Sequence, residues 1–352
     1  MRPYIIIDTT KSFSKLADNE TTVNWQVELY AFIQQWLNLD QHITVQTSGS
    51  TGAPLKIKMP KSAMRASALR TLSYFELNTG MTSLLCLPTS FIAGKMQVVR
   101  AFVGGLKIIA VEPSSVPLLN VNEAIDFAAF TPMQMLEQLN YPDTSKLQLL
   151  KKVIIGGGKI SSELDKMLQQ QPFEAYETYG MTETLTHIAI RKINGNNPQN
   201  SFTPLKSVEI STDNRGCLQI KAPYITNQTI KTNDLATIFA NGSFSITGRI
   251  DNIINSGGIK LSPERIEECI AHLIKLPFVI SSIPHKTMGE QLVLVTEGEL
   301  LTPENILNQI KKEVSKYEVP TAIINLKKLP RTISGKIQRN KVKEMIYNNL
   351  NT

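Results

Sequence analysis

Hydrophobic residues form short continuous runs through the first half of the chain. Four runs have the length and composition of buried strands, and helix-like stretches alternate with them. The strand-like runs are SLLCLP (83–88), LKIIAVE (106–112), FAAF (127–130) and KKVIIGGG (151–158). The helix-like stretches are 64–77, 95–103, 133–139 and 161–170. Because continuous apolar strands are typical of sheets covered on both faces, the pattern predicts an α/β layer with helices packed on a mixed or parallel sheet.

A different pattern begins after about residue 205. Segments of period two, VEIS, CLQIKA and SFSIT, are separated by Asn, Asp and Gly turn residues, which predicts a small antiparallel β unit. Beyond the GRID segment, Ser262-Pro263-Glu264 and Thr302-Pro303-Glu304 each offer an N-cap residue, a proline at the first helical position and an early acidic residue. We therefore expect a large domain over 1–250 and a smaller α+β domain over 251–352.

The charge of the chain narrows the classes of partner. The 352 residues carry a net charge of +7, and lysines become frequent toward the C-terminus. A basic excess suits polyanionic ligands, but it is equally typical of a solvated surface. No interleaved aromatic and basic pattern indicates a nucleic-acid module, so we expect no nucleic-acid partner.

The cysteines and the hydropathy pattern indicate the cellular compartment. Three widely spaced cysteines without a C-x-x-C pair predict neither a disulfide framework nor a zinc site: Cys86, Cys217 and Cys269. The N-terminus lacks the features of a signal peptide, and no run of about 18 apolar residues could span a bilayer. We expect a cytoplasmic protein without a membrane span, whose oligomeric state the sequence leaves open.

The strongest local signal is the segment QTSGSTGAPLKIK. Its small and hydroxyl residues would let backbone amides and hydroxyl groups approach a polyphosphate, and a lysine would offset the phosphate charge. These residues are Thr47, Ser48, Gly49, Ser50, Thr51 and Gly52, with Lys56 or Lys58 as the lysine. The segment is not the P-loop of NTPases, because Pro54 stands where that motif needs its second glycine. A flexible surface turn has the same composition.

Three further segments follow in a distinctive order: YETYGMTET (176–184), TGRIDNIINSGGIKLSPERIEE (247–268) and PRTISGKIQR (330–339). With these segments the chain resembles the adenylate-forming superfamily, which includes acyl-CoA synthetases, peptide-synthetase adenylation domains and luciferases. The resemblance extends from Gln46 to the C-terminus. It implies an AMP-forming acid:CoA ligase with the adenylate-forming fold, which uses ATP, Mg²⁺ and coenzyme A. The alternative of a non-catalytic nucleotide-binding protein is remote.

The resemblance implies a nucleotide site built from several segments. The loop from Thr47 to Gly52, with Lys56, would hold the β and γ phosphates. The residues implied at adenine are Gly156, Gly157, Gly158, Tyr179 and Gly180, and those implied at the ribose are Asp234 and Arg249. A glycine turn after a buried strand is also a common packing device.

The same resemblance implies catalytic residues. Thr182 would contact the α-phosphate, and Glu183 would hold Mg²⁺, which prefers hard oxygen ligands. Lys336 would bridge the substrate carboxylate and the α-phosphate, where an ammonium stabilises developing negative charge. Asp251 would be the hinge about which the 251–352 domain turns, carrying the loop at Gly257 toward the second half-reaction.

The substrate pocket is expected along CLPTSFIAGKMQVVRAFVGGLKI (86–108). Phe91 stands at a position often filled by histidine, and Lys95 and Arg100 could pair with a second carboxylate or be surface charges. The phosphate loop begins at residue 47, earlier than in typical acyl-CoA synthetases, and this indicates a shortened N-terminal region.

Two segments near the expected pocket narrow the choice of acid. IAGKMQVVRAFVGG and YGMTETLTHIAIR resemble the short bacterial o-succinylbenzoate:CoA ligases of menaquinone synthesis. That resemblance would place Thr186 and His187 near an aromatic acid, although a lone histidine is often structural. Another aryl or short acyl acid, or a carrier protein as the acyl acceptor, stays open.

Overall fold

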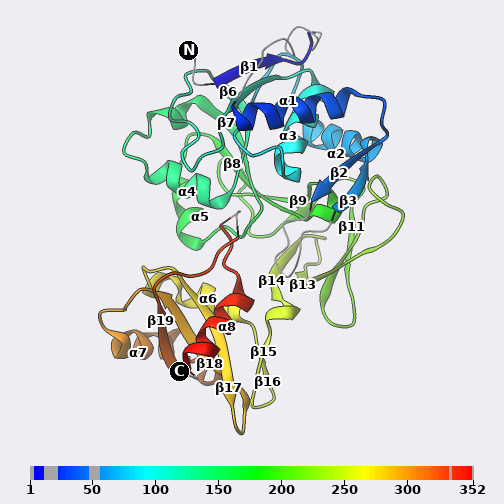
Figure 1. Cartoon of the computed structure of the whole chain (residues 1–352). Coiled ribbons are helices and arrows are strands. Elements are labelled where there is room, and N and C mark those ends of the chain that lie inside the picture. Colours follow the sequence, from blue (N-terminus) through cyan, green and yellow to red (C-terminus); the bar gives the residue numbers. More distant parts are fainter. Residues whose placement is uncertain (1–3, 12–22, 47–55, 333–334, 351–352) are drawn as a thin grey trace. The chain divides into compact units, whose positions relative to one another are not determined.

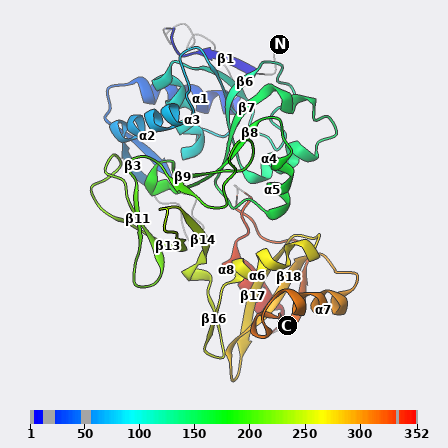
Figure 2. The ribbon, with the colours of Figure 1, turned by 180° about the vertical axis from the view of Figure 1, so that it is seen from behind.

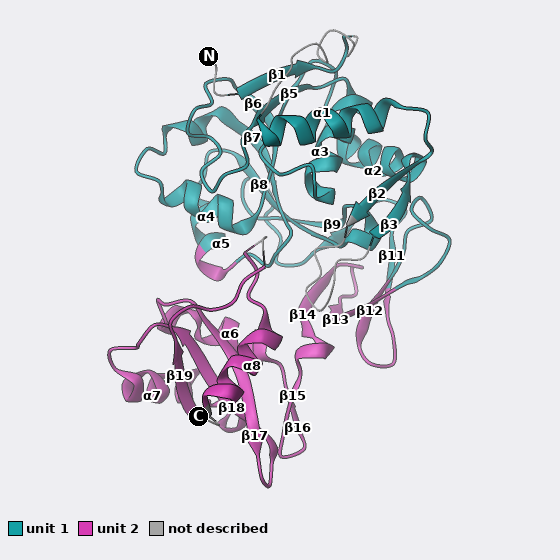
Figure 3. Ribbon diagram, in the orientation of Figure 1, with its two compact units in different colours: residues 1–160, 164–210, 220–230 teal, residues 161–163, 211–219, 231–352 magenta. Residues whose placement is uncertain are grey.

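The structure of the protein is a computed structural model that describes residues 4–11, 23–46, 56–332 and 335–350. Its residues group into two compact units, coloured separately in Figure 3. Unit 1 comprises 1–160, 164–210 and 220–230, and unit 2 comprises 161–163, 211–219 and 231–352. A division into compact units does not show which parts of the chain move, so the domain boundary expected between residues 250 and 251 stays a prediction.

An eight-stranded mixed sheet forms the centre of unit 1. Its order is β1-β5-β4-β6-β7-β8-β9-β10. The strands are β1 (Tyr4–Asp8), β4 (Thr82–Leu85), β5 (Lys107–Val111), β6 (Ile125–Phe130), β7 (Leu150–Ile155), β8 (Glu174–Gly180), β9 (His187–Lys192) and β10 (Thr203–Pro204). The five strands from β5 to β8 in this order are parallel, whereas β1, β9 and β10 pair antiparallel at the edges. Parallel neighbours need crossover connections, which the helices provide.

Helices cover both faces of this sheet. They are α1 (Asn24–Leu37), α2 (Lys61–Tyr74), α3 (Ile92–Gly104), α4 (Pro132–Asn140) and α5 (Ser162–Gln169). In both ribbon views α1, α2 and α3 lie on one side of strands β6 to β8, while α4 and α5 lie on the other (Figures 1 and 2). The layer arrangement expected from the continuous apolar runs is therefore confirmed. Its core includes the fully buried rings of Phe75, Phe127, Phe130 and Phe173.

A two-stranded hairpin flanks the expected phosphate loop. Strands β2 (His42–Gln46) and β3 (Lys56–Pro60) pair antiparallel, with Gln46 opposite Lys56. Lys56 and Lys58 both lie exposed on β3. The loop candidates themselves, Thr47, Ser48, Gly49, Ser50, Thr51 and Gly52, lie outside the described residues.

The expected small β unit is a four-stranded sheet. Its order is β11-β12-β13-β14. The strands are β11 (Glu209–Thr212), β12 (Cys217–Lys221), β13 (Ile230–Ile238) and β14 (Phe244–Arg249). Strands β13 and β14 pair antiparallel with a register shift between Leu235 and Ala236.

A five-stranded sheet carries the rest of unit 2. It contains β15 (Ile254–Ser256), β16 (Ile259–Leu261), β17 (Phe278–His285), β18 (Gly289–Glu297) and β19 (Ala322–Leu326). The helices are α6 (Pro263–Ile270), α7 (Pro303–Glu313) and α8 (Arg339–Leu350). Because side chains alternate along a strand, Ile280 packs with α6 and α7 while Val279 packs with Val342 and Ile346 of α8. The expected α+β arrangement is confirmed.

Helices α6 and α7 begin at the prolines that the sequence indicates, Pro263 and Pro303. The expected capping contacts are absent, because neither Ser262 nor Thr302 makes a side-chain cap hydrogen bond. Ser262 Oγ instead donates to the carbonyl oxygen of Thr247 at 3.2 Å. A proline at the first helical position has no N–H of its own to satisfy and has a backbone φ that suits a helix, which favours both helix starts without the side-chain cap.

The cysteines are all free, and two of them are buried. Burial raises the pKa of the Cys86 thiol to about 12, so this thiol is inert near neutral pH. Among the helices that the structure describes, none is long and apolar enough to cross a membrane.

Candidate active site

Unit 2 brings together residues from distant segments of the chain. The register of β13 and β14 places Asp234 opposite Arg249. Arg249 Nη1 lies 2.9 Å from Asp234 Oδ1, and its Nη2 lies 2.7 Å from Asp251 Oδ2. One guanidinium therefore joins the expected ribose carboxylate to the expected hinge residue.

Asp251 has a second partner that the sequence did not indicate. Asn233 Nδ2 lies 3.0 Å from Asp251 Oδ1 and 3.2 Å from its Oδ2. Arg215 in turn approaches Asn233 Oδ1 at 3.4 Å. These groups are partly exposed, so each single contact stabilises the fold only slightly. Successive residues of a strand point to opposite faces, so the position of Asn233 next to Asp234 gave no sequence signal for this contact.

Lys336 belongs to a short turn that closes on itself. Arg331 and Ile337 form an antiparallel bridge, and the N–H of Thr332 donates to the carbonyl of Lys336 at 2.8 Å. Gly335 has a φ of 84°, in the left-handed region that glycine adopts without strain. The Lys336 side chain is exposed yet crowded enough that desolvation lowers its pKa.

The electrostatic surroundings of Lys336 link it to the same cluster. Desolvation has the largest effect on the pKa of Lys336. The negative charge of Asp234 raises this pKa, and the positive charge of Arg249 lowers it. The structure thus gathers Asp234, Arg249 and Lys336, which the sequence separates by as many as 102 positions (336 minus 234). An ammonium beside an arginine and a carboxylate is suited to a phosphate ester with a hydroxyl-bearing sugar.

Two partly buried contacts anchor the Lys336 turn at its ends. Before the turn, the N–H of Leu329 donates to Glu297 Oε2 at 3.0 Å. After it, Arg339 forms a bidentate pair with Glu267, with Nη1–Oε1 at 2.8 Å and Nη2–Oε2 at 2.5 Å. Burial raises the pKa of the Glu267 carboxyl against the opposing charge of Arg339. Bidentate pairs fix orientation, so the turn has a defined place on its sheet.

The expected adenine segment in unit 1 lies at the end of β7. A Cβ on Gly156 would lie 2.3 Å from Thr178 Oγ1, and Gly157 has a φ of 82°. The glycines therefore allow this turn to approach β8 closely. Tyr179 on β8 is half-buried, with its ring centroid 5.9 Å from that of Phe202. The Gly156–Gly158 turn follows β7, and Tyr179 lies on the adjacent strand β8.

The residues expected at the α-phosphate and the metal follow directly after β8. Thr182 and Glu183 lie in a 3₁₀ turn, Thr182–Thr184, and the Glu183 side chain is exposed. A Cβ on Gly180 would lie 2.4 Å from the carbonyl oxygen of Thr186, so glycine is needed for the close approach of β9.

Mg²⁺ needs few protein ligands because it keeps water and phosphate oxygens around it. The described part of the chain contains no group of three or more His, Cys, Asp or Glu side chains that could hold a metal. One exposed carboxylate such as Glu183 therefore fits a magnesium ion that arrives with a nucleotide, rather than a resident metal.

The expected acid pocket contains a buried arginine. Arg100 on α3 is 3% exposed, its Nη1 donates to Gln97 Oε1 at 3.0 Å, and its Nε has no hydrogen-bond partner among the described residues. Burial lowers its pKa to about 10, so the guanidinium stays charged at neutral pH. No described carboxylate forms an ion pair with it. A buried cation without a counter-ion among the described residues is costly, so an anionic group brought close to Arg100 would be stabilising.

His187 is also buried and lies within electrostatic reach of this arginine. Its Nε2 lies 3.3 Å from Thr71 Oγ1 of α2. Burial, and secondarily the charge of Arg100, lowers the pKa of His187 to about 3, so the ring is neutral at physiological pH. Arg100 and His187, both expected at the acid, thus lie within electrostatic reach of each other.

The other two expected acid-pocket residues lie elsewhere on α3. Lys95 Nζ is 4.5 Å from the ring centroid of Phe32 on α1. Burial lowers the pKa of Lys95, and the charge of Glu28 opposes this shift. Phe91 is the N-terminal cap residue of α3 and is half-buried. Roles for Lys95 and Phe91 in binding an acid stay predictions.

The neutral state of His187 predicts a pH dependence of stability. Between about pH 6.5 and pH 5, the unfolded chain binds a proton that folded His187 does not, so the free energy of unfolding should fall as pH falls. The contribution should reach about 1.4 kcal/mol per pH unit. Urea unfolding at several pH values should show a shallower slope for a His187→Asn variant. Equal slopes would contradict the assigned neutral state.

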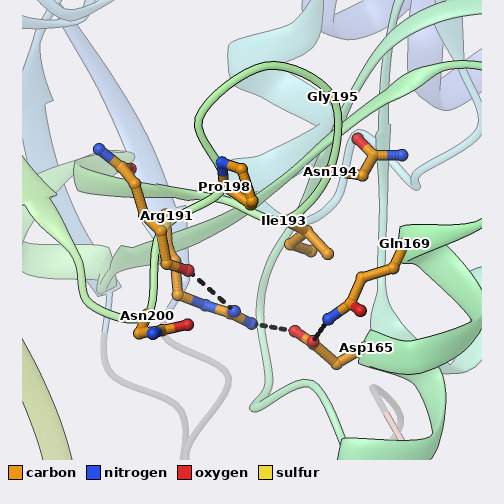
Figure 4. A pocket seen from close by; sticks show the side chains of 9 residues that line it. Asp165, Gln169, Arg191, Ile193, Asn194, Gly195, Pro198 and Asn200 are labelled. Carbon is orange, nitrogen blue, oxygen red and sulfur yellow. Dashed lines mark hydrogen bonds and ion pairs between the residues drawn. The ribbon is translucent and has the colours of Figure 1, made fainter.

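A pocket of about 300 Å³ opens between α5 and the segment after β9. Figure 4 shows Arg191 directed toward Asp165, which lies 2.5 Å away. Arg191 also pairs with buried Glu177 at 2.8 Å, and Glu177 accepts from the N–H of Ile160. The pocket is lined by none of the expected site residues. Its ion pairs support β8 and the segment that follows the glycine turn.

A family model described as AMP-binding enzyme matches residues 3–213. A 2-succinylbenzoate–CoA ligase from Staphylococcus aureus strain JH9 is 25% identical over 368 residues, covering 96% of this chain and 74% of that protein.

Solved structures show the same fold. An acyl-CoA synthetase (AMP-forming)/AMP-acid ligase II-like protein from Dyadobacter fermentans DSM 18053 is 31% identical with a TM-score of 0.65, and the match covers 96% of this chain and 98% of that one. The o-succinylbenzoate coenzyme A synthetase from Bacillus subtilis, in complex with ATP and magnesium, is 21% identical with a TM-score of 0.72, covering 85% of this chain and 69% of that one. At the latter identity the likeness concerns the fold.

Proposed function

Because the chain belongs to the AMP-binding enzyme family, we propose that it is an AMP-forming ligase that activates o-succinylbenzoate and joins it to coenzyme A. Membership of the family bears out the superfamily indicated by the sequence motifs. The names of the Staphylococcus and Bacillus relatives support the choice of acid. The single observation in this chain that carries the choice is the buried guanidinium of Arg100, which has no carboxylate partner among the described residues.

The reaction proceeds in two steps. One carboxylate oxygen of the acid attacks the α-phosphorus of ATP, the bond to the bridging oxygen breaks, and pyrophosphate leaves. The thiolate of coenzyme A then attacks the acyl carbon of the mixed anhydride, and AMP leaves with the electron pair of the carbon–oxygen bond. The first nucleophile is already ionised, so positioning and electrostatics supply most of the rate.

Unit 1 carries the adenine-facing and phosphate-facing roles. Tyr179 offers a ring face for stacking on adenine, beside the close turn at Gly156. Thr182 donates its hydroxyl to the α-phosphate. Glu183 is the residue that would hold Mg²⁺, which neutralises phosphate charge when it is bound with ATP.

Unit 2 carries the sugar-facing and charge-stabilising roles. Asp234 accepts from the ribose hydroxyls, and Arg249 contacts the ribose or a phosphate. Lys336 stabilises the negative charge that develops at the α-phosphate during adenylation. Its lowered pKa reflects desolvation, and a less hydrated ammonium interacts more strongly with a phosphate.

Arg100 carries the choice of substrate. o-Succinylbenzoate has two carboxylates, of which only one is activated. The second would supply the counter-ion that Arg100 lacks among the described residues, and neutral His187 would border the same place without adding charge. The three free cysteines support a reducing cytoplasm as the location of the enzyme.

A panel of acids tests this function. ATP–pyrophosphate exchange should be fastest at low concentrations of o-succinylbenzoate, compared with benzoate and with fatty acids, because only the dicarboxylate pairs with Arg100. Thioester formation should require ATP and free coenzyme A. Equal exchange with benzoate would exclude the proposed acid, and transfer only to a carrier-protein phosphopantetheine would exclude coenzyme A as the acceptor.

A further inference from the structure

The turn that carries Thr182 and Glu183 is tightly folded on itself. The N–H of Met181 donates to Thr184 Oγ1 at 2.9 Å, and the N–H of Leu185 donates to the carbonyl of Thr182 at 3.0 Å. These bonds fix the shape of the turn. They do not fix its direction relative to the rest of unit 1.

Leu185 adopts a strained conformation within this turn. Its φ is 64° and its ψ is −52°, and the N–H of Thr186 donates to the carbonyl of Thr184 at 2.7 Å. This is a γ-turn of the rare positive-φ type. Strain of this kind persists only where the surroundings over-determine the backbone, and it is concentrated at functional sites.

Helix α2 supplies external contacts to the end of the turn. Ser67 Oγ lies 2.7 Å from Thr186 Oγ1, and Thr71 Oγ1 lies 3.3 Å from His187 Nε2. Ser67 and Thr71 are one helical turn apart on the same face. They are 3% and 0% exposed, respectively. The Leu185 side chain, which is 1% exposed, adds an apolar anchor.

We propose that Ser67 and Thr71 are positioning residues, which hold the strained turn from α2 and so aim Thr182 and Glu183 at the MgATP phosphates. This inference rests on the proposed function, because it takes Thr182 and Glu183 to be the phosphate and magnesium contacts. The sequence did not indicate either residue. The sequence pattern that could have indicated them is a pair of hydroxyl residues four positions apart in a helix with buried apolar neighbours. Solvent exposure does not explain such a pair.

If the hydroxyl groups of Ser67 and Thr71 only satisfied the hydrogen-bonding groups of their partners, they would contribute to the stability of the fold and to nothing else. The arrangement argues for more, since both contacts reach residues immediately after the strained Leu185. Without them, the turn could relax its γ-turn and carry Glu183 away from the metal. The expected defect is therefore in the binding of Mg²⁺ and the phosphates.

The test compares a Ser67→Ala, Thr71→Val double variant with the unaltered protein. Calorimetric titration with ATP should show the dissociation constant in the presence of Mg²⁺ rising about tenfold, with the constant in its absence changed less than about twofold. The Mg²⁺ concentration for half-maximal pyrophosphate exchange should rise in parallel. Ser67→Ala alone should show a smaller shift in the same direction, and this variant keeps the test available if the double variant does not fold.

Matched variants distinguish a positioning role of Ser67 and Thr71 from a general loss of structure. Ser73→Ala removes an exposed hydroxyl from the same helix and should leave both constants unchanged. Ser67→Thr and Thr71→Ser retain the hydroxyls and should restore most of the Mg²⁺ effect. A folded double variant with normal Mg²⁺ dependence would overturn the positioning role alone. Unaltered protein that binds no MgATP would overturn the proposed function, and the positioning role with it.

Discussion

Replacing Lys336 with alanine should slow formation of the acyl-adenylate by about 10²–10³-fold, because removal of one preorganised charge at a developing anion has an effect of that size. The structure supports this expectation by bringing Lys336 into the electrostatic surroundings of Asp234 and Arg249. Transfer from supplied acyl-adenylate to coenzyme A should fall by less than about tenfold, since that step breaks no bond to a departing pyrophosphate.

Single-turnover measurements of the two half-reactions check the Lys336 prediction. Lys341→Ala is a suitable control, because Lys341 is an exposed lysine on the neighbouring helix α8. It should affect neither step. An equal loss in both half-reactions of the Lys336→Ala variant would show that Lys336 does not act selectively in adenylation.

Replacing Arg100 with methionine should have opposite effects on stability and on activity. The free energy of unfolding should rise by about 1–2 kcal/mol, because a buried guanidinium that has no counter-ion in the described part of the chain is replaced by an apolar chain of similar length. The kcat/KM for o-succinylbenzoate should fall by about 10²–10³-fold, the loss expected when one partner of a buried charge pair is removed. Benzoate, which has no second carboxylate, should be affected much less.

Urea unfolding measures the effect of Arg100→Met on stability, and pyrophosphate-exchange kinetics with the two acids measure its effect on activity. Lys107→Met provides a matched control, because it removes an exposed charge just beyond the same helix. It should change neither stability nor acid preference appreciably. Equal losses with both acids would indicate general disruption of α3 instead of a lost carboxylate contact. A destabilised variant would show that Arg100 is compensated in the free protein.

The sequence indicated Lys336 more specifically than Arg100. Lys336 was indicated by a contiguous motif, PRTISGKIQR, and its local turn depends on neighbours within that motif. Arg100 was indicated together with Lys95 as an equal alternative. The structure separates them, because five residues along a helix correspond to about 140° of rotation. Lys95 consequently faces Phe32 on α1, while Arg100 lies near His187.

The sequence alone determined the features that depend on local patterns. Continuous apolar runs predicted the covered sheet, and prolines predicted the starts of α6 and α7. The order of four motifs indicated the family. Local patterns failed at the side-chain caps of Ser262 and Thr302. The Ser262 hydroxyl bonds instead to the carbonyl oxygen of Thr247, a partner that only the tertiary structure supplies.

Only the tertiary structure decided which distant groups meet. The pairing of Asp234 with Arg249 follows from strand register, and the nearness of Lys336 to both follows from the packing of unit 2. The contacts of Ser67 and Thr71 with Thr186 and His187 likewise join a helix to a segment more than 100 positions away. Charge, burial and hydrogen bonding act through space, whereas a sequence pattern reports only neighbours along the chain. The physical chemistry of this site therefore becomes visible only when those segments are brought together.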